Sequence, residues 1–282
     1  MPLAKTQSIL KRLLPQRCFV FLYKVACGVY LAGRSTLDSF YYHFSYLYYV
    51  LTGNRQGRNR IKTIRNILPY TMVGRTGLLA TYDIADGVER QGMEGCFVEC
   101  GVARGGCSAL MALVARENKS GRKSWLFDSF EGLPEQTIED EYQEPILGKP
   151  EDRSANLVAQ GYCLGTFEEV EALLFSRLGF SRDNIFMVKG WFADTLPEYK
   201  DKVGAIAVLR IDADWYESTR CCLENLYDNV IAGGYVIVDD YDSVIGCKKA
   251  LDEFLKNRKL AVKLNFDGRG GCYFIKPWSG TA

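Results

Sequence analysis

The sequence predicts an α/β fold with an open, mostly parallel sheet. Short apolar runs recur from residue 96 onwards, and helix-length amphipathic segments separate most of them. This alternation is the pattern of parallel strands joined by crossover helices. Near the C-terminus, two further apolar runs flank the turn-rich link DGRGG, which predicts a closing antiparallel hairpin.

The expected strands are CFVEC at 96–100, SWLFD at 124–128, IFMVKG at 185–190, AIAVLRID at 205–212 and GYVIVDD at 234–240. Helical periodicity is clearest over 167–178 and 216–230. The closing hairpin is expected from the runs 261–266 and 271–277. The stretch 135–163 is acidic and then polar, contains two prolines, and is longer than an ordinary connection, so we expect a lid or binding loop there.

Residues 1–66 are expected to form a helical N-terminal region, and 67–282 the main domain. The first region is rich in aromatic residues and is expected to end in a polar loop, TGNRQGRNR at 52–60. Its most apolar segment, 18–33, is interrupted by Lys24 and is shorter than the roughly 20 apolar residues of a membrane-spanning helix. A lid, a surface that packs in a homo-oligomer, and weak peripheral contact with a membrane are the roles left open for this region.

Composition narrows the range of partners. The 282 residues carry 35 Lys and Arg against 34 Asp and Glu, a formal net charge of +1, so no overall field draws the chain to nucleic acid. The 10 cysteines form no paired CxxC motif, and several lie inside apolar runs, which indicates reduced core residues in a cytoplasmic protein. Chemistry on a small molecule is therefore the expectation.

A nucleoside-containing ligand is expected at the ends of the first two strands. The segment FVECGVARGG ends a strand at Glu99, turns at Gly101 and opens a helix with two glycines, an arrangement that brings a ligand to a helix N-terminus. Asp128 ends the next strand, where an acidic side chain accepts hydrogen bonds from ribose hydroxyls. The glycine spacing is not that of a dinucleotide site, so S-adenosylmethionine is favoured over NAD. A purely structural turn is the alternative.

A cluster of carboxylates is expected at the ends of two later strands. Asp212 ends one strand, and Asp239 and Asp240 end the next, after a single crossover that places both ends at the same edge of the sheet. Clustered carboxylates repel one another strongly unless a cation is bound. Ligands that are all oxygen select Mg²⁺, with Mn²⁺ or Ca²⁺ as alternatives, rather than zinc. Acids that merely cap loops would explain any one of these residues but fit the set poorly.

Histidine is almost absent from the chain. Its one histidine, His43, lies in the aromatic N-terminal region, so a carboxylate is the expected general base. Asp214, two residues after Asp212, is the natural candidate, beside a metal that acidifies a bound hydroxyl. Trp215 and Tyr216 either line the acceptor site or pack at the start of the following helix.

Taken together, six segments resemble the macrocin O-methyltransferase family, whose members use a metal and S-adenosylmethionine to methylate sugar hydroxyls in antibiotic biosynthesis. In chain order they are TMVG (71–74), FVECGVARGG (97–106), DSFEGLP (128–134), VKGWFADTLP (188–197), LRIDADWYEST (209–219) and GGYVIVDDYDSVIGCKKALDEF (233–254). The resemblance covers residues from about 70 to 275. Residues 1–66 show no recognisable family pattern, and Ala213 stands where the family more commonly has glycine.

The resemblance implies a class I methyltransferase fold, a seven-stranded sheet with an antiparallel final hairpin. It implies that Asp212, Asp239 and Asp240 bind the metal and that Asp214 is the general base. It implies that Glu99 and Gly101 contact the methionine part of the cofactor, Asp128 and Ser129 its ribose, and Trp191 and Phe192 its adenine. Thr71 is implied to approach the cofactor from the preceding helix.

The implied reaction is methyl transfer from S-adenosylmethionine to a small-molecule hydroxyl, first of all on a sugar of a glycosylated natural product. A catechol or another phenol is the alternative acceptor, because the same metal chemistry works on it. Two alternatives come from other classes of protein. One is a metal-dependent glycosyltransferase, in which an Asp-x-Asp motif holds the metal of a nucleotide sugar, and the other is a cofactor-binding module without catalytic activity.

Overall fold

The computed structural model describes residues 37–140 and 163–278. These residues divide into two compact units, 37–65 and the remainder, and each is described here by itself. Two features expected from the sequence lie outside the described residues, namely the apolar segment 18–33 and most of the expected lid, 141–162. In the described part of the chain, no helix combines the length and apolar character needed to cross a membrane.

The first unit is a pair of helices. Residues 37–51 form the first helix, and α3 (Arg55–Ile67) is the second. The turn between them is fixed by Asn54, whose Oδ1 accepts a hydrogen bond from the backbone N–H of Gly57 at 2.8 Å. Glycine is needed at position 57 because a Cβ there would lie only 2.6 Å from the ring of Tyr49. The two helices therefore pack closely where the turn joins them.

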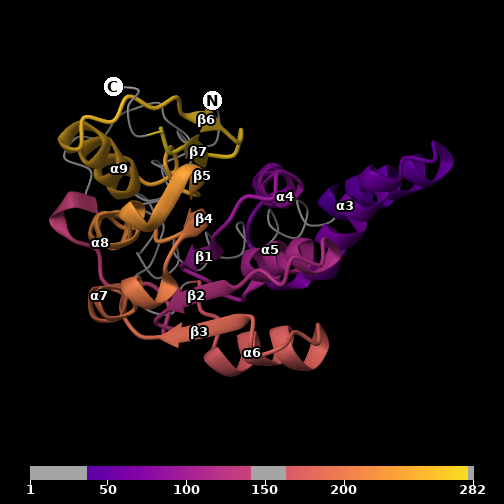
Figure 1. The fold of residues 1–282 in the computed structure, drawn as a ribbon, viewed down its shortest axis with the longest axis horizontal. Helices are drawn as coiled ribbons and strands as arrows, with labels where there is room; N and C mark the ends of the chain where they lie inside the picture. Colours follow the sequence, from indigo (N-terminus) through magenta and orange to yellow (C-terminus); the bar gives the residue numbers. More distant parts are fainter. Residues whose placement is uncertain (1–36, 141–162, 279–282) are drawn as a thin grey trace, which may run out of the picture. The chain divides into compact units, whose positions relative to one another are not determined.

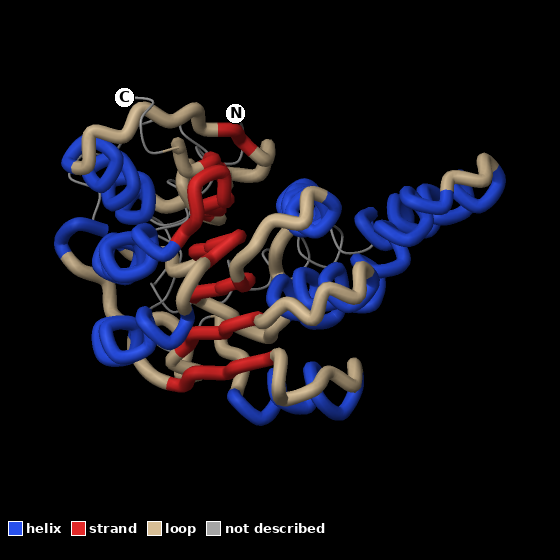
Figure 2. Tube along the Cα trace, viewed as in Figure 1, coloured by secondary structure: helices blue, strands red, loops and turns tan. Residues whose placement is uncertain are grey.

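The second unit is built on a seven-stranded sheet, drawn in red in Figure 2. Its strands are β1 (Cys96–Cys100), β2 (Ser124–Asp128), β3 (Ile185–Lys189), β4 (Ile206–Ile211), β5 (Val230–Val238), β6 (Asn265–Phe266) and β7 (Cys272–Ile275). Their order across the sheet is β3-β2-β1-β4-β5-β7-β6. Strands β1 to β5 are parallel, and β7 is antiparallel to both of its neighbours. The predicted α/β class I methyltransferase fold with its closing hairpin is confirmed.

Helices cover both faces of this sheet (Figure 1). One face carries α4 (Arg75–Arg90), α5 (Gly106–Glu117) and α6 (Phe167–Glu171), the last continued by a π-helical segment, Ala172–Arg177. The other carries α7 (Phe192–Val203), α8 (Tyr216–Leu226) and α9 (Ile245–Asn257). Short 3₁₀ turns occur at Leu68–Tyr70, Ile138–Asp140 and Tyr227–Asn229. Because helices cover both faces, the central strands β1 and β4 are buried along their whole length, and apart from Glu99 and Arg210 their residues are apolar.

The topology decides where a ligand can bind. From β1 the chain adds β2 and β3 on one side, and then β4 and β5 on the other. In parallel α/β sheets, the crevice at such a reversal of strand order, at the carboxyl ends of the strands, is the usual ligand site. The acidic residues expected from the sequence lie at the carboxyl ends of β1 and β2 or directly after those of β4 and β5, so they lie at this edge.

Candidate active site

Three aspartates converge where β4 and β5 end. Asp212 and Asp214 follow β4, and Asp240 follows β5, which is the neighbour of β4 in the sheet. The parallel register aligns the two strand ends by pairing Ile211 with Val238. One carboxylate oxygen from each aspartate lies within 4.8 Å of the other two, with Asp214 and Asp240 buried and Asp212 partly exposed. This is an arrangement that could hold a metal ion.

Asp214 reaches the cluster through an unusual backbone conformation. Its φ is +54°, in the left-handed region that aspartate tolerates better than most residues. The next N–H, that of Trp215, donates to the carbonyl of Ala213 at 2.6 Å, so the chain turns sharply. In a straight strand, Asp212 and Asp214 would share a face with Cα atoms about 6.6 Å apart. The turn ends the strand and leaves both carboxylates in one cluster.

The remaining predicted metal ligand, Asp239, is held by two arginines. Its Oδ1 accepts a hydrogen bond from Arg210 Nη2 and its Oδ2 one from Arg269 Nη1, each at 2.6 Å. Arg210 is fully buried on β4, and its Nη1 also contacts Glu99 at 2.9 Å and Asp212 at 2.8 Å. This one guanidinium therefore ties together the carboxyl ends of three adjacent strands.

Negative charge is crowded in this cluster. Burial and the neighbouring carboxylates of Asp239 and Asp240 raise the pKa of Asp212 well above its usual range, and Arg210 offsets only part of the rise. A bound cation would relieve this repulsion. Two oxygens on opposite sides of Mg²⁺ are about 4.2 Å apart, and three donor oxygens that all lie within 4.8 Å of one another are compatible with that separation. The residues present therefore fit a hard divalent cation.

The loop after β1, where the cofactor is expected, is braced by Asp128. Its Oδ2 accepts hydrogen bonds from the backbone N–H groups of Val102 at 2.6 Å and Ala103 at 3.0 Å, and its Oδ1 accepts one from Phe130 at 2.6 Å. Burial raises the pKa of Asp128, and these three hydrogen bonds oppose the rise. An ionised carboxylate has about four acceptor positions. Asp128 can therefore hold the loop and still accept a hydrogen bond from a ligand hydroxyl.

Glu99 and Gly101 define the end of β1. Glu99 is buried, and its carboxylate accepts hydrogen bonds from Arg210 and from the hydroxyl of Ser108 in the first turn of α5. Gly101 has a φ of +84°, and a Cβ at this position would overlap the carbonyl oxygen of Asp212. Only glycine allows the backbones after β1 and β4 to approach this closely, beside the crevice where the strand order reverses.

The other predicted cofactor residues follow strands or helices near this edge. Thr71 packs against Gly106, the first residue of α5. Ser129 follows β2, and its hydroxyl forms hydrogen bonds within a local turn. Trp191 precedes α7 and is 41% exposed, whereas Phe192 begins the helix and packs partly against the core. Their contacts with the cofactor stay predictions.

Three further residues at the site were not predicted: Arg210, Arg269 and Cys163. The position of Arg210 inside an apolar strand could have identified it from the sequence, because a buried basic residue needs acidic partners. No local feature of the sequence identifies Arg269, since its contact with Asp239 joins positions 30 residues apart. Cys163 lies close enough to the clustered aspartates and Asp128 that their charges add to burial in raising its pKa.

The segment after β2 is anchored beside the site by Asp140. This buried carboxylate accepts hydrogen bonds from the backbone N–H of Tyr216 at 2.7 Å and from that of Thr137 at 2.9 Å. Trp215 is also buried, and its Nε1 donates to the carbonyl of Pro134 at 2.9 Å. Of the two roles left open for Trp215 and Tyr216, these contacts favour packing at the start of α8.

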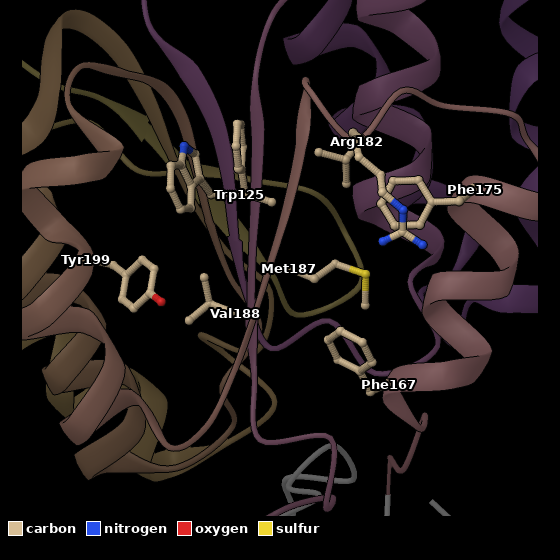
Figure 3. A pocket seen from close by; sticks show the side chains of 9 residues that line it. Trp125, Phe167, Phe175, Arg182, Met187, Val188 and Tyr199 are labelled. Carbon is tan, nitrogen blue, oxygen red and sulfur yellow. The ribbon is translucent and has the colours of Figure 1, made fainter.

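A cavity of about 330 Å³ lies elsewhere, along the edge strand β3. Trp125 and Tyr199 line it on one side of the strand, and Phe167 and Phe175 on the other (Figure 3). None of the clustered aspartates contributes to its lining. This cavity is therefore separate from the carboxylate cluster.

Replacement of Arg269 by alanine should lower the free energy of unfolding by about 2–4 kcal/mol, because it removes one partner of a buried ion pair. Both side chains of the Arg269–Asp239 pair are less than a tenth exposed, at 9% and 4%. The matched control is Arg258→Ala, which breaks an Arg–Asp pair whose side chains are 42% and 63% exposed. Exposed pairs contribute about 1 kcal/mol or less. Urea denaturation measures both variants, and equal losses would contradict the structural role given to Arg269.

The sequence matches the model of the Macrocin-O-methyltransferase (TylF) family over residues 51–276. This match begins at residue 51, inside the N-terminal region 1–66, whereas the resemblance seen in the sequence motifs begins at about residue 70. Among curated relatives, demethyldecarbamoylnovobiocin O-methyltransferase of Streptomyces niveus is 36% identical over 206 residues, which is 73% of this chain and 75% of the relative. The 8-demethyl-8-(2,3-dimethoxy-alpha-L-rhamnosyl)-tetracenomycin-C 4'-O-methyltransferase of Streptomyces olivaceus is 36% identical over 186 residues, 66% of this chain and 67% of the relative.

Solved structures agree with this match. The O-methyltransferase NovP superposes with a TM-score of 0.63 at 33% identity, over 74% of this chain and 83% of that protein. The calicheamicin methyltransferase CalS11 shares the fold, with a TM-score of 0.53 at 19% identity, over 80% of this chain and 93% of that protein. The fold, the family match and the relatives agree. The chain belongs to the TylF macrocin-O-methyltransferase family and is an S-adenosylmethionine-dependent O-methyltransferase.

Proposed function

We propose that this enzyme methylates a sugar hydroxyl of a glycosylated small molecule, and that a divalent cation, Mg²⁺ first of all, holds that hydroxyl. The observation that carries the proposal is the convergence of Asp212, Asp214 and Asp240 at the ends of two neighbouring strands. A sugar acceptor is supported by the Streptomyces olivaceus relative, which is named for a rhamnosyl-tetracenomycin. A third relative, mycinamicin III 3''-O-methyltransferase of Micromonospora griseorubida, is 30% identical over 73% of this chain.

We assign two roles to the aspartates, namely binding the cation and accepting the proton of the acceptor hydroxyl. Asp212 and Asp240 hold the cation, and Asp239 completes the set while Arg210 and Arg269 fix its orientation. When bound, S-adenosylmethionine supplies a methyl group on a positively charged sulfur, and the metal lowers the pKa of the acceptor hydroxyl. Asp214 would accept the proton of the acceptor hydroxyl as the methyl group passes from the sulfur to the oxygen, with S-adenosylhomocysteine as the leaving group.

The cofactor is proposed to lie across the ends of β1 and β2. The end of β1 at Glu99 and Gly101 faces its methionine part, because the strand order reverses there. Asp128 and Ser129, which end and follow β2, are assigned to the ribose. Thr71 approaches from the segment before α4. The adenine is assigned to Trp191 and Phe192, where the partly exposed indole offers a stacking surface.

Removal of divalent cations should abolish methyl transfer, because the acceptor hydroxyl then keeps its high pKa and loses its anchor. The purified enzyme is incubated with methyl-labelled S-adenosylmethionine and a panel of glycosylated natural products, with and without EDTA. We expect labelled product on a glycosylated acceptor, none in EDTA, and recovery when Mg²⁺ is added back. Full activity in EDTA would remove the metal from the mechanism.

The same assay tests the acceptor class. A parallel panel of catechols has neighbouring hydroxyl groups but no sugar, so it isolates the contribution of the sugar. Preference for the glycosylated panel supports the proposal. Turnover of catechols alone would keep the methyltransferase chemistry and replace the sugar with a phenolic acceptor.

A further inference from the structure

Charge is divided unevenly along this chain. Residues 1–67 carry 11 Lys and Arg and a single acidic residue, Asp38, whereas residues 68–282 carry 24 Lys and Arg and 33 Asp and Glu. The formal net charge is therefore +10 in the first segment and −9 in the second, although the whole chain has +1. Such asymmetry indicates an anionic partner for the basic segment.

The helix 37–51 carries a row of apolar side chains on its exposed side. The row, called here the apolar row, consists of Leu37, Phe40, Phe44, Leu47 and Leu51, which recur at steps of three or four residues and so share one face. Their exposed fractions are 70, 57, 63, 47 and 77%, respectively. Large side chains that are exposed together over four turns of helix mark a docking surface.

The opposite side of this helix packs against α3, which is strongly basic. The ring of Tyr49 fills the space beside Gly57, and the guanidinium of Arg65 lies 5.5 Å from the ring centroid of Tyr46. Helix α3 contains no acidic residue, and its basic residues are Arg55, Arg58, Arg60, Lys62 and Arg65. The unit therefore combines an apolar face on one helix with a positively charged second helix.

We propose that this helix pair docks on an anionic lipid surface, with the apolar row among the acyl chains and the basic side chains of α3 at the lipid phosphates. Nucleic acid would pair with the basic side chains and leave the apolar row in water. A second copy of this chain would cover the apolar row but bring two basic segments together. A lipid surface uses both features, as amphipathic interfacial helices do.

Co-sedimentation of the full-length protein with vesicles tests this proposal. One vesicle preparation is pure phosphatidylcholine, and the other contains one third phosphatidylserine. We expect binding at least tenfold tighter to the anionic vesicles, and a loss of most of that difference in 0.5 M NaCl, since salt screens the lipid charge. Equal binding to both preparations, or to neither, would overturn the proposal.

Two pairs of variants separate the apolar from the electrostatic contribution. Phe44→Ser with Leu47→Ser should weaken vesicle binding at least tenfold. Its control is Phe266→Ser with Ile275→Ser, which removes similar side chains of similar exposure, 57% and 45%, from the second unit and should leave binding unchanged. Circular dichroism confirms that each variant is folded.

The charge variant is Arg55→Glu with Lys62→Glu, two exposed positions on α3. Each basic side chain near an anionic surface contributes about fivefold to partitioning, so this variant should bind at least 25-fold more weakly. Its control, Lys256→Glu with Lys259→Glu, changes the net charge equally at exposed positions around the end of α9 and should have little effect. Light scattering of the Phe44→Ser, Leu47→Ser variant tests the alternative partner, a second copy of this chain. If these substitutions dissociate an oligomer and leave vesicle binding unchanged, a second copy covers the apolar row and the lipid proposal is wrong.

Discussion

Replacement of Asp240 by asparagine should lower methyl transfer by about a hundredfold or more, because a neutral amide is a weaker ligand for a hard cation than a carboxylate. The fold should survive, since asparagine has the same shape. Asp240 Oδ1 accepts a hydrogen bond from the hydroxyl of Ser243 at 2.9 Å, and an amide oxygen can still accept it. Turnover with labelled cofactor gives the rate, and calorimetric titration with Mg²⁺ gives the metal affinity. The control is Asp242→Asn, an exposed aspartate two residues away.

The same titration distinguishes the roles of the neighbouring aspartates. If Asp214 is the base, Asp214→Asn should retain metal affinity and lose activity by a factor of about 100 to 10,000. If Asp239 is a ligand, Asp239→Asn should weaken metal binding although Arg210 and Arg269 remain beside it. Loss of metal affinity in Asp214→Asn, with normal affinity in Asp239→Asn, would instead make Asp214 the third ligand. That outcome would match the grouping of oxygens in the structure and reject the assignment made from the sequence.

Replacement of Gly101 by alanine should lower the free energy of unfolding by about 3 kcal/mol or more and abolish cofactor binding. The left-handed conformation costs an alanine about 1–2 kcal/mol. The added Cβ would also overlap the backbone carbonyl of Asp212, which cannot move without displacing the end of β4. Urea denaturation measures the stability, and calorimetry measures the binding of S-adenosylhomocysteine.

Gly121→Ala is the matched control for this substitution. Gly121 also has a positive φ, +66°, but no atom lies within 4 Å of the position of an added Cβ. It should therefore show the conformational cost alone, with normal cofactor binding. Equal losses in the two variants would mean that the close approach of the strand ends contributes nothing.

Much of the fold could be predicted because its pattern is local. The strands at 96–100 and 124–128 have the predicted bounds, since a buried parallel strand is a short apolar run. Strand β5 begins at Val230 instead of Gly234, because a register shift lets β4 pair with Val230 as well as with Tyr235. Such a bulge depends on pairing across the sheet, which the strand's own sequence does not reveal.

For the candidate site, the sequence predicts which acidic residues lie at the ends of neighbouring strands. The sequence places Asp212 and Asp240 at neighbouring strand ends, because the crossover rule connects them. It also places Asp214 beside the metal as the expected base, but it does not show the turn that brings this carboxylate among the ligands, because the turn depends on a left-handed backbone conformation at a residue other than glycine. Nor does it show Arg269, which approaches Asp239 only after the closing hairpin has folded onto the sheet.

The left-handed backbone of Asp214 has a consequence for laboratory evolution. Ala103 and Phe130, in the loops after β1 and β2, have the same sign of φ, at +44° and +56°, so three loops at this edge of the sheet hold residues other than glycine in a conformation that favours glycine. Selection for thermostability alone would favour glycine at position 214, which relieves the strain and removes the carboxylate. At this position a more stable protein would be a poorer enzyme, so a screen for robust variants must also select for turnover.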